Sequence, residues 1–199
     1  MPAPTIYYLR HGETDWNRTG RLQGTLDIPL NDLGREQAVH AGRVLGGLIA
    51  RDGRNKNGLP FVASPLGRAR VTMELARTQL QLPPSDYALD ERLREIGYGT
   101  WEGRTLAEAE AQDPDVYARR LQDKWTVGAP GGETYLDVQR RMHAWYDDLR
   151  TDTVAVAHGG TARALMVVLG FETPQSAADL YIEQGVVYVF GPDGLTKYG

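Results

Sequence analysis

The chain has 199 residues, a length typical of one domain, and its hydrophobic content of 41% and charged content of 24% are those of an ordinary globular protein. A formal net charge of −4 provides no electrostatic footprint for nucleic acid, and no stretch approaches the ~20 apolar residues of a membrane span. Cysteine is absent, which excludes disulfides, thiol nucleophiles and thiolate metal sites, so we expect a single cytoplasmic domain over residues 1–199 without nucleic-acid or membrane partners.

The first predicted element is a buried strand over the apolar run at residues 5–9. This strand ends directly on Arg10, His11 and Gly12. In an open α/β sheet, ligands bind outside the carboxyl ends of the strands. An arginine and a histidine at such an end, followed by a glycine that permits close backbone approach, predict a site for an anionic group.

Two helices with a short strand between them follow the first loop. Asn31 is a suitable N-cap for a helix that runs to about residue 50. Apolar residues recur in this helix at helical spacing, and the expected inward positions are Leu33, Ala38, Ala41, Leu45 and Leu48. Residues 61–63 are a short strand, and Ser64-Pro65 is predicted to supply the N-cap and first residue of the next helix. Pro83-Pro84 ends that helix.

The middle of the chain is less regular. Residues 87–89 are a candidate short strand, and residues 92–103 contain three glycines that predict an irregular loop. Residues 104–124 hold two weakly amphipathic helical pieces, which are broken near Asp113-Pro114. A turn-rich segment follows, so we expect residues 104–131 to form an excursion from the sheet that covers a site.

The C-terminal part returns to regular helices and strands. The predicted elements are a helix at 133–150, a central strand at 153–157, a helix that opens on His158-Gly159-Gly160 and runs to residue 169, a short helix at 174–178 and a strand at 186–190. Strands that alternate with helices predict a three-layer α/β/α sandwich. If the sheet is parallel, Arg10, His158 and Arg68 follow strand ends that lie at one edge.

The loop after the first strand, Arg10-His11-Gly12-Glu13-Thr14 with Asn17, resembles the signature of the histidine phosphatase superfamily. This superfamily includes the cofactor-dependent phosphoglycerate mutases and many broad phosphomonoester phosphatases. The likeness covers nearly the whole chain, since it recurs at Arg21-Leu22-Gln23-Gly24 and at residues 29–34, 64–69, 93–96 and 157–160. It implies a phosphoglycerate mutase-like fold with a mostly parallel mixed sheet and one antiparallel edge strand.

The same resemblance implies a set of catalytic residues. His11 would be the nucleophile that forms a phosphohistidine, because an imidazole is unprotonated near neutral pH. Arg10 and Arg68 would bind the phosphoryl oxygens through their rigid fork of donors. His158, at the start of a helix, would also donate to the phosphate. Glu95 would protonate the leaving oxygen.

Further binding residues follow from the extended motif. Asn17 and the Gly159 amide would donate to the phosphate, and Arg21, Gln23 and Gly24 would bind substrate. Each residue also has a plain structural interpretation. His11 could be a hydrogen-bonded structural histidine, Asn17 a turn residue, and Glu95 part of a surface charge cluster. Arg21 could instead bind its loop through an ion pair, and the neighbouring Arg70 competes with Arg68 as the phosphate ligand.

We therefore expect a metal-independent phosphomonoester hydrolase that needs no cofactor, takes a small phosphorylated metabolite and releases inorganic phosphate. Mutase-type phosphoryl transfer is the alternative, followed by a non-catalytic module that binds a phosphorylated ligand. The excursion favours hydrolysis, because its four cationic and five acidic side chains are a poor match for a bisphosphorylated acid. Members of this family are often dimers or tetramers, so the resemblance also allows a homodimer.

Overall fold

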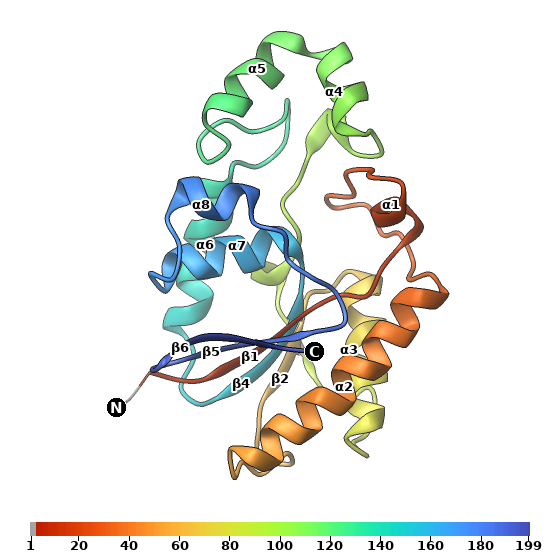
Figure 1. Ribbon diagram of the computed structural model, residues 1–199, viewed down its shortest axis with the longest axis vertical. Coiled ribbons are helices and arrows are strands. Elements are labelled where there is room, and N and C mark those ends of the chain that lie inside the picture. The colour runs from red at the N-terminus through yellow and green to blue at the C-terminus, as the bar shows by residue number, and fades with distance from the viewer. Residues whose placement is uncertain (1–2) are drawn as a thin grey trace.

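The computed structural model describes residues 3–199, and its core is one mixed sheet (Figure 1). In that part of the chain the strand order is β3-β2-β4-β1-β5-β6. The strands are β1 (Ile6–Arg10), β2 (Phe61–Ala63), β3 (Ala88–Leu89), β4 (Thr153–Ala157), β5 (Val187–Gly191) and β6 (Gly194–Tyr198). The first four are mutually parallel, and β5 is antiparallel to both β1 and β6. The expected mostly parallel mixed sheet is confirmed.

Helices cover both faces of the sheet, which confirms the three-layer sandwich (Figure 1). One layer is formed by α2 (Asp32–Arg51) and α3 (Gly67–Gln79), and the other by α6 (Tyr135–Asp147), α7 (Gly159–Val168) and α8 (Pro174–Asp179). Side chains of β1 alternate between the two cores: Tyr7 and Leu9 pack with the α2–α3 layer, and Ile6 and Tyr8 with the α6–α7 layer. The strand is therefore buried on both faces, as parallel strands usually are.

The segment 104–131 projects away from the sheet (Figure 1), and we call it the cover. It contains α4 (Leu106–Gln112) and α5 (Pro114–Gln122), so the predicted break at Asp113-Pro114 is confirmed. A small separate core forms at its base, where Trp101 is fully buried and its indole Nε1 donates to Asp113 Oδ2 at 2.7 Å. The short helix α1 (Asp15–Arg18) and the 3₁₀-helices Glu91–Leu93 and Gly99–Trp101 complete the fold.

Three details differ from the sequence-based expectations. Helix α3 begins at Gly67 with Leu66 at the N-cap position, and the Ser64 hydroxyl, expected to cap this helix, instead lies 2.7 Å from His158 Nε2. Leu33, expected to face inward, is 49% exposed in the first turn of α2. Strand β6 was not anticipated, and it places the antiparallel strand β5 one position in from the edge. Within residues 3–199, no helix is both long and apolar enough to cross a membrane.

Candidate active site

The carboxyl ends of the central strands converge on one cavity of about 130 Å³. Arg10 is the last residue of β1 and is paired in register with Ala157, the last residue of β4, which His158 follows directly. The cavity is lined by Arg10, His11, Asn17, Arg21, Leu22, Gln23, Gly24, Arg68, Glu95, Tyr98, Gly159 and Arg163. The structure thus brings together the residues that the sequence singled out.

His11 is only 1% exposed and lies in the loop that follows β1. Its Nδ1 is 2.7 Å from the carbonyl oxygen of Gly12, so Nδ1 carries the hydrogen and donates it, and Nε2 keeps a free electron pair. Burial, and then the nearby charges of Arg68 and Arg10, hold the pKa of His11 well below its ordinary value of 6.5. The imidazole is therefore neutral near neutral pH, which is the nucleophilic form.

Two glycines allow the His11 loop to lie directly on the start of α2. A Cβ on Gly12 would fall 2.0 Å from the carbonyl oxygen of Gly34, and a Cβ on Gly34 would fall 2.0 Å from that of Glu13. Side chains of both helices in this layer then hold the loop. The Gly12 amide donates to Thr72 Oγ1 at 3.1 Å, and the Glu13 amide donates to Gln37 Oε1 at 2.8 Å.

Carbonyl oxygens, rather than carboxylates, hold the two arginines of the predicted phosphate site. Arg68 is 1% exposed, and it donates to the carbonyls of Leu26 at 2.6 Å and Gly24 at 2.9 Å. Arg10 donates to the carbonyl of Ile182. In each guanidinium group the Nε atom is buried and has no hydrogen-bond partner within residues 3–199. These contacts fix the two cations and leave donors for an anion.

His158 lies against His11, with ring centroids 5.1 Å apart and planes inclined at 60°. It is fully buried, its Nε2 lies 2.7 Å from the Ser64 hydroxyl, and its Nδ1 has no hydrogen-bond partner among the described residues. Burial, followed by the charge of Arg68, also holds the pKa of His158 well below its ordinary value. A neutral His158 can donate to a bound anion without competing for the role of nucleophile.

Glu95 lies over the first turn of α7, so it is not part of a surface charge cluster. Its Oε1 accepts hydrogen bonds from the amides of Ile96 and Gly160, both at 2.9 Å. A Cβ on Gly160 would lie 2.3 Å from that oxygen, so only glycine allows the carboxylate this close to the helix. The two amides occupy Oε1, and Oε2 accepts no hydrogen bond from the described residues. The partly exposed Arg94 and the exposed Glu91, by contrast, pair with each other at 3.1 Å.

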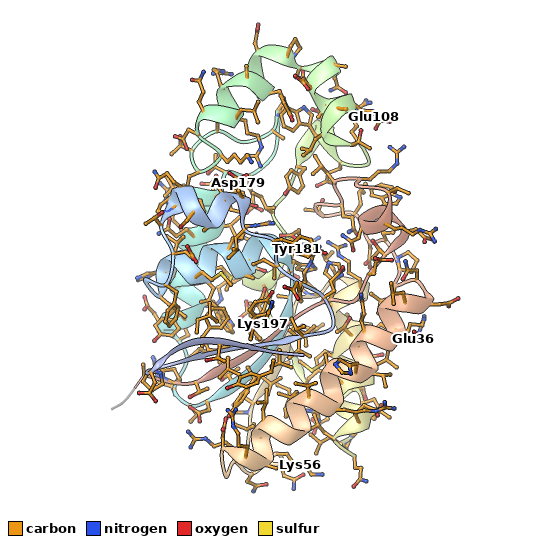
Figure 2. All side chains as sticks on the ribbon, in the orientation of Figure 1. Glu36, Lys56, Glu108, Asp179, Tyr181 and Lys197 are labelled. Atoms are coloured by element: carbon orange, nitrogen blue, oxygen red, sulfur yellow. The ribbon has the colours of Figure 1, made fainter. Side chains whose placement is uncertain are left out.

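Asn17 and Arg21 both line the cavity, but they differ in their partners. Asn17 turns its amide oxygen toward the Thr14 amide, 3.1 Å away. Arg21 forms an ion pair with Glu108 of the cover at 2.9 Å, which is the alternative role weighed for it, and Figure 2 shows Glu108 on α4. The competing Arg70 is exposed, and the phenol of Tyr87 raises its pKa. The buried Arg68 is therefore the arginine at the cavity.

Gln23 and Gly24 form the rim between Arg68 and the cover. Gln23 is 6% exposed, and its Oε1 is buried without a hydrogen-bond partner in the part of the chain that the structure describes. Gly24 has a positive φ of 54°, and a Cβ there would lie 2.0 Å from Glu102 Oε1. Its carbonyl is one of the two that hold Arg68. Gly24 thus acts through the backbone, in support of the arginine.

A second, larger cavity of about 290 Å³ adjoins the first and was not anticipated from the sequence. The two share Leu22, Tyr98 and Arg163, and we call the larger one the chamber. Arg163 donates to the Leu180 carbonyl at 2.8 Å and to the Tyr135 hydroxyl at 3.1 Å. Arg163 could have been predicted as a site residue from the sequence, because it lies four residues after Gly159 and therefore on the same face of the helix.

The cover supplies the far wall of the chamber. Arg120 of α5 turns inward, is 9% exposed and donates to the carbonyls of Lys124 and Val127. Its neighbour Arg119 is exposed. Lys124 also lines the chamber but is paired with Asp179 at the end of α8 (Figure 2). The chamber therefore contains two arginines, Arg120 and Arg163, that carbonyl and hydroxyl oxygens hold.

Comparisons with known proteins agree with this geometry. A family model described as "Histidine phosphatase superfamily (branch 1)" matches residues 6–195. A glucosyl-3-phosphoglycerate phosphatase of Mycolicibacterium vanbaalenii is 38% identical over 183 residues, which cover 85% of this chain and 75% of the relative. A 2,3-bisphosphoglycerate-dependent phosphoglycerate mutase of Methylocella silvestris is 30% identical over 195 residues, which cover 93% and 90%.

Solved structures show the same likeness. A mycobacterial glucosyl-3-phosphoglycerate phosphatase in complex with VO3 superposes with a TM-score of 0.78 and is 32% identical to the chain, with 94% of this chain and 92% of the other covered. The similarity thus extends over nearly the whole fold, including the strands whose ends carry the candidate site.

Proposed function

This chain belongs to the histidine phosphatase superfamily, and from that premise we propose that it is a metal-independent phosphatase that hydrolyses small phosphomonoesters through a phosphohistidine on His11. The substrate is a small phosphorylated metabolite, and inorganic phosphate is the product. Its relatives include proteins named as phosphatases and proteins named as mutases, so the choice between hydrolysis and transfer rests on the chain itself.

The observation that carries the proposal is the set of buried nitrogen atoms beside His11. Arg10 Nε, Arg68 Nε and His158 Nδ1 are each shielded from solvent, and each lacks a hydrogen-bond partner in the described chain. A buried donor without a partner costs about 1–3 kcal/mol, so native proteins rarely keep several of them together. A phosphoryl group on the free Nε2 side of His11 would accept from all three.

In the first step, His11 Nε2 attacks phosphorus and the bond to the leaving oxygen breaks. Arg10, Arg68 and His158 stabilise the charge on the other phosphoryl oxygens, and most catalysis of phosphoryl transfer is positioning and charge stabilisation of this kind. Glu95 Oε2 gives its proton to the leaving oxygen, so the product departs as a neutral alcohol.

In the second step, water attacks the phosphohistidine. Glu95, now ionised, takes the proton from that water, and the phosphorus–nitrogen bond breaks to return neutral His11 and release phosphate. Two guanidinium groups provide the charge neutralisation that a divalent cation supplies in other phosphatases, and the neutral His158 adds a hydrogen bond. We therefore propose that no metal takes part.

The chamber next to the phosphate site is the place for the leaving group. Its two arginines, Arg120 and Arg163, face a space that also contains the aromatic rings of Tyr98, Tyr117 and Tyr135. This lining suits an acidic leaving group that bears hydroxyls, and curated relatives are named for glucosyl-3-phosphoglycerate. We propose that compound as the first candidate substrate.

The proposal is tested by hydrolysis of p-nitrophenyl phosphate. We expect wild type to release phosphate at an unchanged rate when a chelator is present, and to give an acid-labile, base-stable phosphoryl adduct on rapid quench.

His11→Ala should lower turnover by at least about 10³-fold without loss of folded structure, because the nucleophile is gone. His143→Ala is the matched control, since His143 is exposed on α6, where its Nδ1 lies 2.9 Å from Asp147 Oδ2. Substantial activity in folded His11→Ala would falsify the nucleophile assignment, and chelator loss with rescue by one divalent ion would refute metal independence.

A further inference from the structure

Residues 180–185 join α8 to β5, and we call them the strap. The strap is tied to three residues of the active-site cavity. The Leu180 carbonyl accepts from Arg163 at 2.8 Å, and the Ile182 carbonyl accepts from Arg10. Two strap residues also reach the cavity residues through their side chains. The Tyr181 ring lies 6.0 Å from the Arg10 guanidinium carbon, and Gln184 Nε2 donates to Asn17 Oδ1 at 3.1 Å.

The amide oxygen of Asn17 receives hydrogen bonds from three directions. The Thr14 amide and the Thr14 hydroxyl each lie 3.1 Å from Oδ1, and Gln184 Nε2 is the third donor at the same distance. An amide oxygen has two lone pairs, so this acceptor is fully used. The orientation of a side-chain amide is assigned from such a network. With Oδ1 facing Thr14 and Gln184, Nδ2 makes no hydrogen bond within the described residues, and Asn17 lines the cavity.

The opposite orientation would be harmful to phosphate binding. With the amide reversed, an oxygen instead of two N–H donors would face the phosphoryl group, and two acceptors repel. Thr14 supplies two of these donors from within the same four-residue cap as Asn17, so that part of the network is local. Gln184 approaches from a segment 167 residues away in sequence that is anchored through the fully buried Ile182.

We propose that Gln184 is a positioning residue, which holds the Asn17 amide so that its N–H groups point to the phosphoryl group. This inference rests on the proposed phosphatase function and adds a residue outside every motif found in the sequence. Gln184 acts through Asn17 and does not itself line the phosphate cavity.

The experiment measures inhibition by vanadate and the KM and kcat for p-nitrophenyl phosphate. Gln184→Met keeps the length of the side chain but removes the donor. We expect it to weaken vanadate binding and raise KM by about threefold to tenfold, the range of one neutral hydrogen bond, while kcat changes less. Gln184→Glu places an acceptor opposite Asn17 Oδ1, which should turn the amide and weaken vanadate binding further.

A double-mutant cycle separates positioning from general support of the fold. In an Asn17→Ala background, Gln184→Met should change vanadate affinity by less than about twofold, because the group it positions is gone. Equal loss in both backgrounds, or no loss in the wild-type background, would overturn the proposal. Glu183→Gln is the matched control, since this neighbouring strap residue pairs with Lys197 on β6 (Figure 2) and should leave both constants unchanged.

A second measurement keeps the test decisive if Asn17→Ala does not fold. The side-chain ¹⁵N resonance of Asn17 should shift when vanadate binds to wild type, and should shift less in Gln184→Met. An identical shift in both proteins would contradict the proposal. Failure of the phosphatase function is a distinct result, because it would appear as an absence of p-nitrophenyl phosphate hydrolysis by wild type while vanadate binding is still measured by calorimetry.

Discussion

At the scale of single residues, His11 and His158 link the chemistry of the site to the stability of the fold. Both are buried and neutral, with pKa values held well below 6.5, whereas the unfolded chain protonates them near that value. Below pH 6.5 the unfolded state therefore binds more protons than the folded state, so the free energy of unfolding falls as the pH falls. Above pH 6.5 this loss is absent.

We expect urea unfolding to show this loss between pH 7.5 and pH 5.5. Its slope should approach about 1.4 kcal/mol per pH unit for each histidine once the pH is below 6.5. His11→Gln should remove part of the slope, and His143→Gln, which changes an exposed residue, should not. A free energy of unfolding that stays constant over this pH range would contradict the assignment of two neutral buried histidines.

Glu95 offers a second prediction at the residue scale. Glu95→Gln keeps an oxygen that can accept from the Ile96 and Gly160 amides but removes the transferable proton. We expect kcat/KM for an alkyl phosphate to fall by about 10²–10⁴, the usual contribution of a general acid. The same change should slow p-nitrophenyl phosphate less than about tenfold, since its phenolate leaves with little help. Equal slowing of both substrates would mean that Glu95 only secures the start of α7.

At the scale of elements, the sequence predicts whatever depends on local periodicity or capping. Helix α2 begins directly after its predicted cap, Asn31, whose side chain accepts from the Gly34 amide at 2.8 Å. The break between α4 and α5 follows from Pro114 in the same way. The start of α3 could not be predicted, because Ser64 is engaged by His158, which is remote in sequence. Strand β6 escaped notice because it is a partly exposed edge strand without a clear apolar alternation.

The residues of the candidate site also fall into two groups: those that local sequence predicts and those that only the tertiary structure shows. Arg10, His11, Arg68, Glu95 and His158 were found through motifs, whose spacing reports a shared fold. The chamber was not found, because no periodic pattern shows which side chains of the cover turn inward. The strap was also missed, since its contacts with the site use two backbone carbonyls, the ring of Tyr181 and the side chain of Gln184, none of which belongs to a motif.

At the scale of the whole molecule, ligand preference depends on where the charged side chains lie more than on the net charge of the cover. Counting the cover alone suggested a weakly acidic surface unsuited to an acidic ligand. The structure corrects this argument: Arg120 turns into the chamber, Arg119 faces solvent, and Lys124 is offset by Asp179. With Arg163 from α7, the chamber is cationic on balance. Charge therefore favours an acidic leaving group and no longer separates a phosphatase from a mutase.

Volume is the property that still separates the two reactions. A mutase must exclude water from the phosphohistidine while the bound substrate reorients to receive the phosphoryl group at its other hydroxyl. Here the phosphate cavity shares three lining residues with a chamber of about 290 Å³, and a water molecule occupies only roughly 30 Å³ of liquid. A three-carbon acid would leave room for several waters beside the phosphohistidine, and these should hydrolyse it.

We therefore expect 3-phosphoglycerate, supplied with a trace of 2,3-bisphosphoglycerate, to lose phosphate faster than it isomerises. A larger leaving group that fills the chamber should bind more tightly, so glucosyl-3-phosphoglycerate should show a lower KM than 3-phosphoglycerate. Both reactions can be followed together by ³¹P NMR, with Arg120→Gln as a variant that should raise KM for these acidic substrates more than for p-nitrophenyl phosphate. Isomerisation ahead of phosphate release would show that the chamber closes around small substrates, and the chain would then be a mutase.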